Sequence, residues 1–285
     1  LSTRRLPTAS CRLHRLEPIV ENGVQLNPHG LRRPPIRSQL TGLYNMRSTS
    51  RTCATSVVAA LLLLTPIAAD EKETFYQPIE KNLEGWTIRV DPQLVNGEHA
   101  ELGDKALSAL ANHLQRIKFI LDEKRVAVLQ KRPIWIERDN PKIRGMQYHP
   151  GRGWLIAHDL DPHLVKHVHI PQAGALLTRQ VWAKHPYVIL HELAHAYHDQ
   201  VLSFDQAKII QVFEEARDKG IYDKVLLYTG QNVRHYALSN HKEYFAEMTE
   251  SYLGVNDFYP FVRAELKEHD PKMFALMQEI WGPLR

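Results

Sequence analysis

Apolar and polar residues follow regular patterns in several segments of this 285-residue chain. Trp86–Val90 alternates apolar and polar positions, which predicts a strand. Short strands are also expected at Pro133–Glu137 and at Val168–Ile170, with turn residues over Tyr148–Trp154 between them. Apolar residues recur at helical spacing in one further segment: Leu107, Leu110, Leu114, Ile117 and Ile120. Together these segments predict a small mixed sheet with a helix.

Helical spacing dominates from Trp182 onward, with a hairpin expected at 225–236 that turns at 229–232. The predicted helices run from Trp182 to about Leu202 and over Ala207–Lys219, His241–Leu253, Tyr259–Glu268 and Lys272–Trp281. We therefore expect an α+β fold in one domain, with a sheet-containing subdomain over 70–181 and a helical subdomain over 182–285 that flank a cleft.

Composition changes sharply near the amino terminus. The first 52 residues hold nine arginines, no lysine and two acidic residues. From Met46 a basic start leads into the uncharged run Val57–Ala69, which ends in two alanines. This layout predicts a secretory signal peptide over 46–69, because the run is short for a membrane span and Pro66 interrupts it. Residues 1–45 are then interpreted as sequence translated upstream of the real start, or as an organelle transit peptide.

Charge and cysteine usage follow the same division. The whole chain has a net charge of +4. The first 52 residues contribute +7, so the remainder carries −3. No stripe typical of nucleic-acid binding is evident there, and no stable membrane insertion is expected after cleavage. Both cysteines, Cys11 and Cys53, lie in the part to be removed. A periplasmic or secreted protein without thiol ligands or a cysteine nucleophile is predicted.

The segment His191-Glu-Leu-Ala-His195 carries the strongest chemical signal. It places two imidazoles one helical turn apart with the Glu192 carboxylate beside the first, an arrangement that binds zinc and activates a water. Apolar residues at helical spacing on both sides predict an amphipathic helix that holds the motif. The alternative is a histidine pair that binds no metal.

A catalytic zinc needs a third protein ligand. A longer pattern with a third histidine would require glycine at 198 and histidine at 201, where this chain has His198 and Val201. Glu243 is therefore the preferred third ligand, with Glu247 one turn later accepting a hydrogen bond from a ligand histidine. The alternative for these two carboxylates is a solvated helix face.

Two further residues follow the motif. We expect His198 to have a supporting or exposed role, and Asp199 to cap or pair locally near the site, with an exposed helix position as the alternative for Asp199. Val168–Ile170 is the candidate edge strand for pairing with an extended substrate, and an ordinary strand ended by Pro171 is the alternative.

At His191–Asp199 and Tyr236–Glu247 the chain resembles the anthrax lethal factor-like zinc metallopeptidases, a family that includes the Pro-Pro endopeptidases. The resemblance runs from about Trp182 to Trp281 and is weak upstream. It implies a zincin-like fold in which His191, His195 and Glu243 bind zinc. It also implies that Glu192 is the catalytic carboxylate and that the tyrosine seven residues before the zinc glutamate, here Tyr236, is catalytic. His198 departs from the acidic residue of the lethal factor pattern.

The sequence thus predicts an exported zinc endopeptidase that acts on a peptide or protein substrate. In the expected mechanism Glu192 takes a proton from a zinc-activated water, and Tyr236 donates a hydrogen bond to the developing oxyanion. A zinc amidase acting on a non-protein substrate remains an alternative, as does a zinc-stabilised binding protein without turnover. The presence of Glu192 argues against a binding protein without turnover, because this glutamate is not needed to hold the metal.

Overall fold

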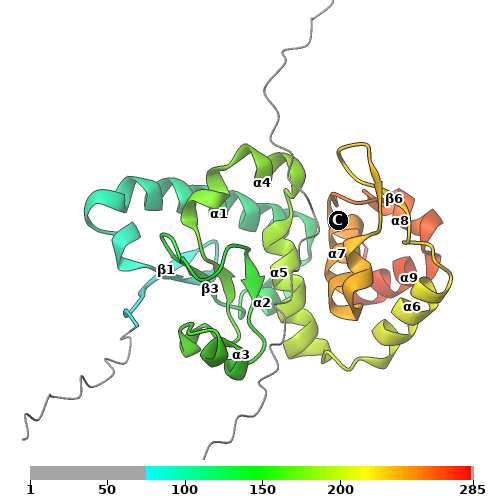
Figure 1. The fold of residues 1–285 in the computed structure, drawn as a ribbon, viewed down its shortest axis with the longest axis horizontal. Coiled ribbons are helices and arrows are strands. Elements are labelled where there is room, and N and C mark those ends of the chain that lie inside the picture. Colours follow the sequence, from blue (N-terminus) through cyan, green and yellow to red (C-terminus); the bar gives the residue numbers. More distant parts are fainter. Residues whose placement is uncertain (1–74, 284–285) are drawn as a thin grey trace, which may run out of the picture. The chain divides into compact units, whose positions relative to one another are not determined.

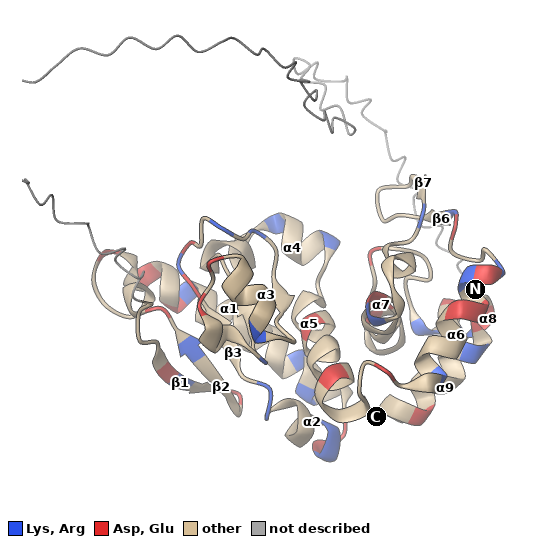
Figure 2. Cartoon of the chain, turned by 60° about the horizontal axis from the view of Figure 1, so that its bottom comes forward, with Lys and Arg blue, Asp and Glu red and all other residues tan. Residues whose placement is uncertain are grey.

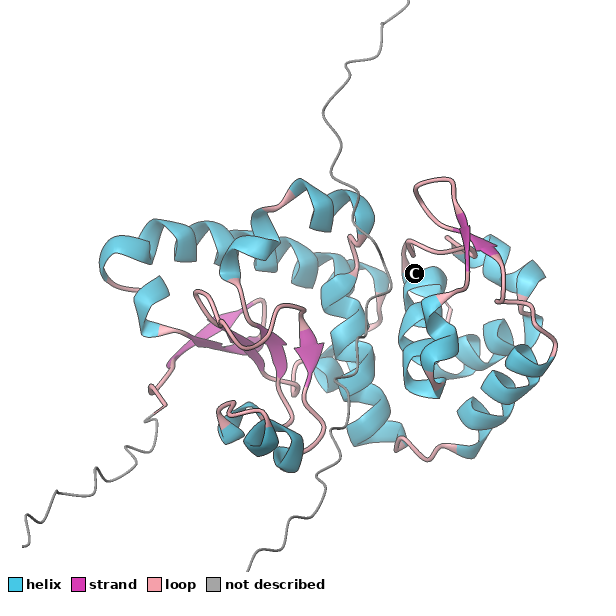
Figure 3. Cartoon of the chain, in the orientation of Figure 1, coloured by secondary structure: helices cyan, strands magenta, loops and turns pink. Residues whose placement is uncertain are grey.

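A five-stranded mixed sheet forms the amino-terminal part of the computed structural model, which describes residues 75–283. Its strands are β1 Ile79–Leu83, β2 Trp86–Val90, β3 Ile134–Ile136, β4 Gln147–Tyr148 and β5 Val168–Ile170, in the order β1-β2-β3-β5-β4. The expected segments 1–45 and 46–69 lie outside the described residues. The mixture of helices with a small sheet confirms the α+β class (Figure 3).

The centre of this sheet is parallel and its two margins are antiparallel. β2 pairs with β3 and β3 with β5 in parallel, whereas β1 and β4 run antiparallel to their neighbours. All residues of β3 and β5 are buried, as expected of parallel strands covered on both faces. The core of the sheet merges with that of the helices, because one hydrophobic cluster contains residues of both.

The prediction that Val168–Ile170 forms the edge of the sheet is wrong. β5 is hydrogen-bonded to β3 on one side and to β4 on the other, so it has no free edge. β4 is the outer strand of the sheet that the described residues form. Its two residues are too few to give an alternating pattern, and Pro150 and Gly151 directly after it favoured a turn.

Four helices accompany the sheet: α1 Ala100–Ile120, α2 Glu123–Leu129, α3 Arg152–Ala157 and α4 Arg179–Lys184. α1 follows the predicted apolar spacing, and Leu110, Leu114 and Ile117 on its inner face are fully buried. α2, which the apolar pattern did not reveal, is capped by Asp122, whose carboxylate accepts a hydrogen bond from the Arg125 backbone N–H. Short 3₁₀ turns connect these elements at Pro92–Leu94, Gly97–His99, Pro162–Leu164 and Ala173–Leu177.

Five helices dominate the carboxyl-terminal part: α5 Val188–Tyr197, α6 Ala207–Asp218, α7 His241–Leu253, α8 Arg263–His269 and α9 Pro271–Trp281. α5 continues as a π-helical turn over His198–Leu202, and a 3₁₀ turn over Tyr236–Ser239 precedes α7. The hairpin of β6 Val225–Leu226 and β7 Asn232–Val233 lies at its predicted place. α8 starts later than predicted, because Pro260 disfavours helical backbone at Tyr259.

α5 and α7 pack side by side, and this pair joins the sheet-bearing elements to the carboxyl-terminal helices (Figure 1). All ten residues of Tyr244–Leu253 are buried, so α7 is enclosed along most of its length. Figure 2 shows basic and acidic residues scattered over the described elements. No helix within residues 75–283 is long and apolar enough to cross a membrane.

Candidate metal centre

The motif helix α5 is rigidly held in the core. Nine of its ten residues are buried, and its apolar residues belong to the main hydrophobic cluster. His191 and His195 are four residues apart, so their side chains lie on the same face of the helix, toward α7. Burial of the surrounding backbone therefore fixes the positions from which both imidazole rings extend.

The structure brings together the three residues that the sequence predicts as metal ligands. Nε2 of His191 lies 3.1 Å from Nε2 of His195. Oε2 of Glu243 lies 3.3 Å from the former and 3.2 Å from the latter. Three donors at zinc-bond lengths of about 2.0–2.1 Å from a tetrahedral ion would be about 3.3–3.4 Å apart. The three donor atoms therefore fit zinc with little movement.

Glu243 is placed by the first turn of α7. Asn240 caps this helix, and its Oδ1 accepts hydrogen bonds from the backbone N–H groups of Lys242 and Glu243. Burial alone would raise the pKa of Glu243, but the contacts with His191 and His195 lower it well below its usual range. The Glu243 carboxylate is therefore ionised, as a metal ligand must be.

Glu192 lies beside the three donor residues, anchored by the sheet. Its Oε2 accepts a hydrogen bond of 2.8 Å from the Tyr148 backbone N–H in β4. Burial raises the pKa of Glu192, and the nearby charges of His191 and His195 reduce that effect. A carboxylate with a raised pKa is suited to taking up and returning a proton near neutral pH.

Tyr236 lies at the rim of the same cleft, in the 3₁₀ turn before α7. The residue is 50% exposed, so solvent or a substrate can reach it. Partial burial and then the negative charge of Glu243 raise its pKa, which keeps the phenol protonated. Its hydroxyl group can therefore act as a hydrogen-bond donor.

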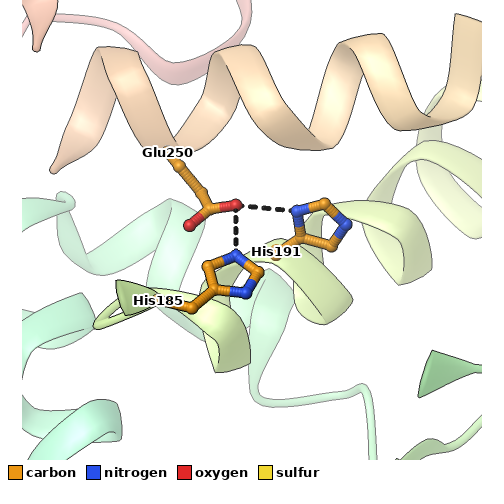
Figure 4. A group of neighbouring side chains, drawn as sticks. All are labelled: His185, His191 and Glu250. Carbon is orange, nitrogen blue, oxygen red and sulfur yellow. Dashed lines mark hydrogen bonds and ion pairs between the residues drawn. The ribbon is translucent and has the colours of Figure 1, made fainter. Parts of the chain in front are cut away.

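Glu250, and not the predicted Glu247, accepts the hydrogen bond from Nδ1 of His191. Oε1 of Glu250 lies 2.7 Å from Nδ1 of His191 (Figure 4). Oε1 of Glu247 lies 3.9 Å from the same nitrogen, beyond hydrogen-bonding distance. Glu243, Glu247 and Glu250 share one face of α7, and the packing of α7 against α5 brings the third of them to this nitrogen. Glu247 instead accepts a hydrogen bond from the Asn256 side chain.

Asp199 does not contact the three donor residues through any hydrogen bond or ion pair of the described chain. It accepts a hydrogen bond from the Tyr148 hydroxyl and forms an ion pair with Lys166. Asp199 thus ties the end of the motif helix to β4, whose backbone holds Glu192. An exposed position is wrong for Asp199, because these two partners cover its carboxylate.

His198 is fully buried, which excludes the exposed one of the two roles expected for it. Its ring packs against Phe204 and Phe245, at centroid distances of 5.1 Å and 4.8 Å. Neither of its ring nitrogens has a hydrogen-bond partner among the described residues. Burial lowers the pKa of His198 to about 3, so the ring is neutral and contributes packing.

A cleft of about 720 Å³ opens over the three donor residues. The helical wall of this cleft, from α5 and α7, includes His191, Glu192, His195, Glu243 and Glu247. The strand wall consists of Arg144–Tyr148, which contains β4 and the loop before it. Lys184, His185, Tyr236 and Phe258 extend the lining beyond these two walls. The volume and open shape of the cleft leave room for a peptide of several residues.

Three contributors to the site were not predicted from the sequence. The Tyr148 backbone and Glu250 each hold a residue of the motif, and His185 holds Glu250. Glu250 had a weak signal, because it follows Glu243 by seven residues and so lies on the same helix face. The contributions of His185 and of the Tyr148 N–H arise from tertiary packing and have no signal in the local sequence.

No protein-family model matches this chain, and no curated protein matches it. One solved structure that matches is the Pro-Pro endopeptidase from Paenibacillus alvei, with 16% sequence identity and a TM-score of 0.38. The match covers 68% of this chain and 95% of that chain. A TM-score this low does not establish a common fold, so the inferences below depend on the geometry of this chain itself. The resemblance of this chain to the lethal factor-like family stays a prediction.

Proposed function

We propose that this chain is an exported, zincin-like zinc endopeptidase. The observation that carries the proposal is the convergence of three metal-ligating atoms, from His191, His195 and Glu243, with mutual distances of 3.1–3.3 Å. A buried carboxylate beside them and an open cleft above them supply what a hydrolase needs besides a metal. Export is proposed from residues 46–69 alone.

The donor set favours zinc among common metals. Two imidazoles and one carboxylate are a ligand set of known catalytic zinc sites, which keep one position open for water or substrate. Magnesium and calcium prefer oxygen ligands throughout, so they suit this set poorly. Bound zinc would supply Lewis acidity, which polarises a substrate carbonyl and lowers the pKa of a water.

Glu192 is proposed as the general base and then the general acid. Its position beside, but outside, the group of three donors lets it take a proton from the attacking water. The hydrogen bond from the Tyr148 N–H fixes its carboxylate, and its raised pKa makes the return of that proton to the leaving amine easier. The peptide C–N bond breaks as the nitrogen gains the proton.

Tyr236 is proposed as the donor to the oxyanion. Its half-exposed position at the rim and its protonated state leave the hydroxyl hydrogen available when a substrate fills the cleft. One such donor contributes about 3 kcal/mol to transition-state stabilisation in other acyl-transfer enzymes.

The substrate backbone is proposed to bind along the strand wall. β4 is paired with β5 on one side, and both β4 and the residues before it, 144–146, line the cleft. An extended peptide can add to such an edge through main-chain hydrogen bonds, which are independent of side-chain identity. A peptide or protein substrate therefore fits the cleft.

The proposal is tested by incubating the purified, zinc-loaded chain with a diverse peptide library and reading the products by mass spectrometry. We expect cleavage that a chelator abolishes and added zinc restores. Absence of cleavage by a chain that holds stoichiometric zinc would contradict the peptidase assignment. Release of ammonia or an amine from non-peptide amides by that chain would instead indicate an amidase.

A further inference from the structure

A second group of side chains lies directly behind the three donor residues. Oε1 of Glu250 lies 2.7 Å from Nδ1 of His191 and 2.9 Å from Nε2 of His185 (Figure 4). Glu250 is 0% exposed, and its other oxygen has no hydrogen-bond partner among the described residues. A single carboxylate oxygen, deep in the core, thus serves two histidines.

The two nitrogens of His191 face different groups. Nε2 faces His195 and Glu243, while Nδ1 faces Glu250. The 2.7 Å and 2.9 Å distances at Glu250 are those of hydrogen bonds, with each ring N–H donating to the carboxylate. An N–H at Nδ1 leaves the lone pair of His191 at Nε2, which is the nitrogen that faces the other donors.

We propose that Glu250, itself held by His185, is the positioning residue that fixes the tautomer and orientation of His191 and thereby sets the affinity of the site for its metal. This inference rests on the metal site of the proposed function but not on peptide cleavage. It assigns to Glu250 the role that the sequence assigned to Glu247.

The contrast between Glu247 and Glu250 supports this assignment. Both are buried residues of α7, but the nearest oxygen of Glu247 is 3.9 Å from Nδ1 of His191. Asn256 holds the Glu247 carboxylate through a hydrogen bond to Oε2, whereas Oε1 of Glu250 is at hydrogen-bonding distance from both His185 and His191. Glu250 is therefore the carboxylate placed to orient the His191 ring.

His185 restricts the Glu250 carboxylate from the other side. It lies between α4 and α5, and its backbone is fixed by hydrogen bonds to Val181 and from Val188. Its ring also meets that of His191 edge-on, with centroids 5.5 Å apart and an interplanar angle of 78°. His185 belongs to the cleft lining and its side chain is 24% exposed, so substitution there disturbs the core less than substitution of Glu250.

The test compares Glu250→Gln with Glu247→Gln in the full chain. Both variants exchange a buried carboxyl group of α7 for an amide of the same shape. The zinc dissociation constant is measured by competition with a chromophoric chelator, and the visible spectrum of the cobalt-loaded protein reports the ligand geometry. We expect about 10- to 100-fold weaker zinc binding and a shifted cobalt spectrum for Glu250→Gln, and less than about threefold weaker binding with an unchanged spectrum for Glu247→Gln.

His185 variants give a second route that avoids the deepest core position. His185→Ala removes one hydrogen bond to Glu250 and should weaken zinc binding by about three- to tenfold. His185→Gln keeps an N–H donor and should restore most of that loss. If the Glu250→Gln variant does not fold, the two His185 variants still test the inference.

Three results would overturn the inference: unchanged zinc affinity in folded Glu250→Gln, an equal or larger loss in Glu247→Gln, or no effect of His185→Ala where Glu250→Gln does not fold. These readouts differ from that of the proposed function. A wild-type chain that binds zinc and cleaves no peptide would remove the peptidase and leave Glu250 in its role. A wild-type chain that cleaves peptides, together with variants of unchanged zinc affinity, would keep the peptidase and remove the proposed role of Glu250.

Discussion

The helical wall and the strand wall of the cleft differ in how firmly their residues are held. The proposed metal ligands come from α5 and α7, where most residues are buried. In the strand wall, Arg144 and Gly145 are exposed, Met146 and Gln147 are half-buried, and Tyr148 is buried. One wall is therefore part of the core, while the other is a surface segment attached to it.

This difference matches the demands of the two tasks. Metal ligands must keep their positions within a fraction of an ångström, which helices packed into a core provide. A surface that binds substrates must offer free backbone groups and adaptable side chains, which an edge strand and its loop provide. The Tyr148 N–H connects the two, because it extends from the strand wall to Glu192 in the helical wall.

The largest expected effect is that of Glu192→Gln in the helical wall. The amide cannot take a proton from water, so kcat should fall by about 10²–10⁴-fold, while zinc stoichiometry stays at one because Glu192 is outside the donor group. Product formation from a cleaved peptide, measured beside metal content, checks both parts. Loss of zinc together with activity would show that Glu192 belongs to the metal site itself.

Removal of a ligand should give the opposite signature. Glu243→Ala takes away one of the three converging donors, so zinc binding should weaken by more than about 100-fold, beyond the range expected for a supporting residue. Chelator competition measures it, with the exposed Glu214→Ala in α6 as the matched control. Stoichiometric zinc of unchanged affinity in Glu243→Ala would place the third ligand elsewhere.

Tyr236→Phe tests the rim of the cleft. Loss of the phenolic hydrogen bond should lower kcat by about 10²-fold without changing zinc affinity. Tyr228→Phe is the control, since Tyr228 is similarly exposed, in the loop between β6 and β7, and is not part of the cleft lining. Equal turnover of Tyr236→Phe and wild type would exclude the hydroxyl from the mechanism.

Asp199→Asn tests the link between the two walls. The change removes the charge that holds the Tyr148 hydroxyl and Lys166, so β4 and the anchor of Glu192 should loosen. We expect kcat/KM to fall by about three- to tenfold, equivalent to roughly 1 kcal/mol, with zinc affinity unchanged. Asp218→Asn, at an exposed position of α6, should have no effect. A loss of zinc from Asp199→Asn would assign Asp199 to the metal site instead.

The smallest effect concerns the buried His198 next to the helical wall. Its pKa is about 3 in the folded chain, against about 6.5 when unfolded, so folding opposes its protonation. Its contribution to stability is therefore complete above pH 6.5 and declines as the pH falls toward 3. Between pH 7 and pH 5 the free energy of unfolding should fall by about 1–2 kcal/mol more in wild type than in His198→Leu. Urea unfolding of the metal-free proteins measures this difference, and equal pH slopes would contradict it.

The helical wall could be predicted from the sequence to a large extent. His191 and His195 are readable because helical periodicity alone puts residues four apart on one face. Glu243 followed from its spacing to Tyr236 in the resemblance. The choice between Glu247 and Glu250 could not be made, because both share a face with Glu243 and only the packing of α7 on α5 separates them by more than an ångström in their distance to His191.

The strand wall could not be predicted. β4 has two residues, which is too short for an alternating pattern, and its edge position depends on the order of strands that are distant in the sequence. Val168–Ile170 was mistaken for the edge because its apolar run and terminal proline fit an edge strand as well as a central one. The sequence left a supporting and an exposed role open for His198 for a related reason, since a histidine in a helix gives no sign of which aromatic rings will cover it.

The most direct test of the metal centre is a crystal structure of the zinc-loaded chain with anomalous diffraction recorded on both sides of the zinc absorption edge. We predict a single zinc peak, within about 2.0–2.2 Å of Nε2 of His191, Nε2 of His195 and a carboxylate oxygen of Glu243. A zinc peak among His185, Nδ1 of His191 and Glu250, or none near α5, would contradict the assignment.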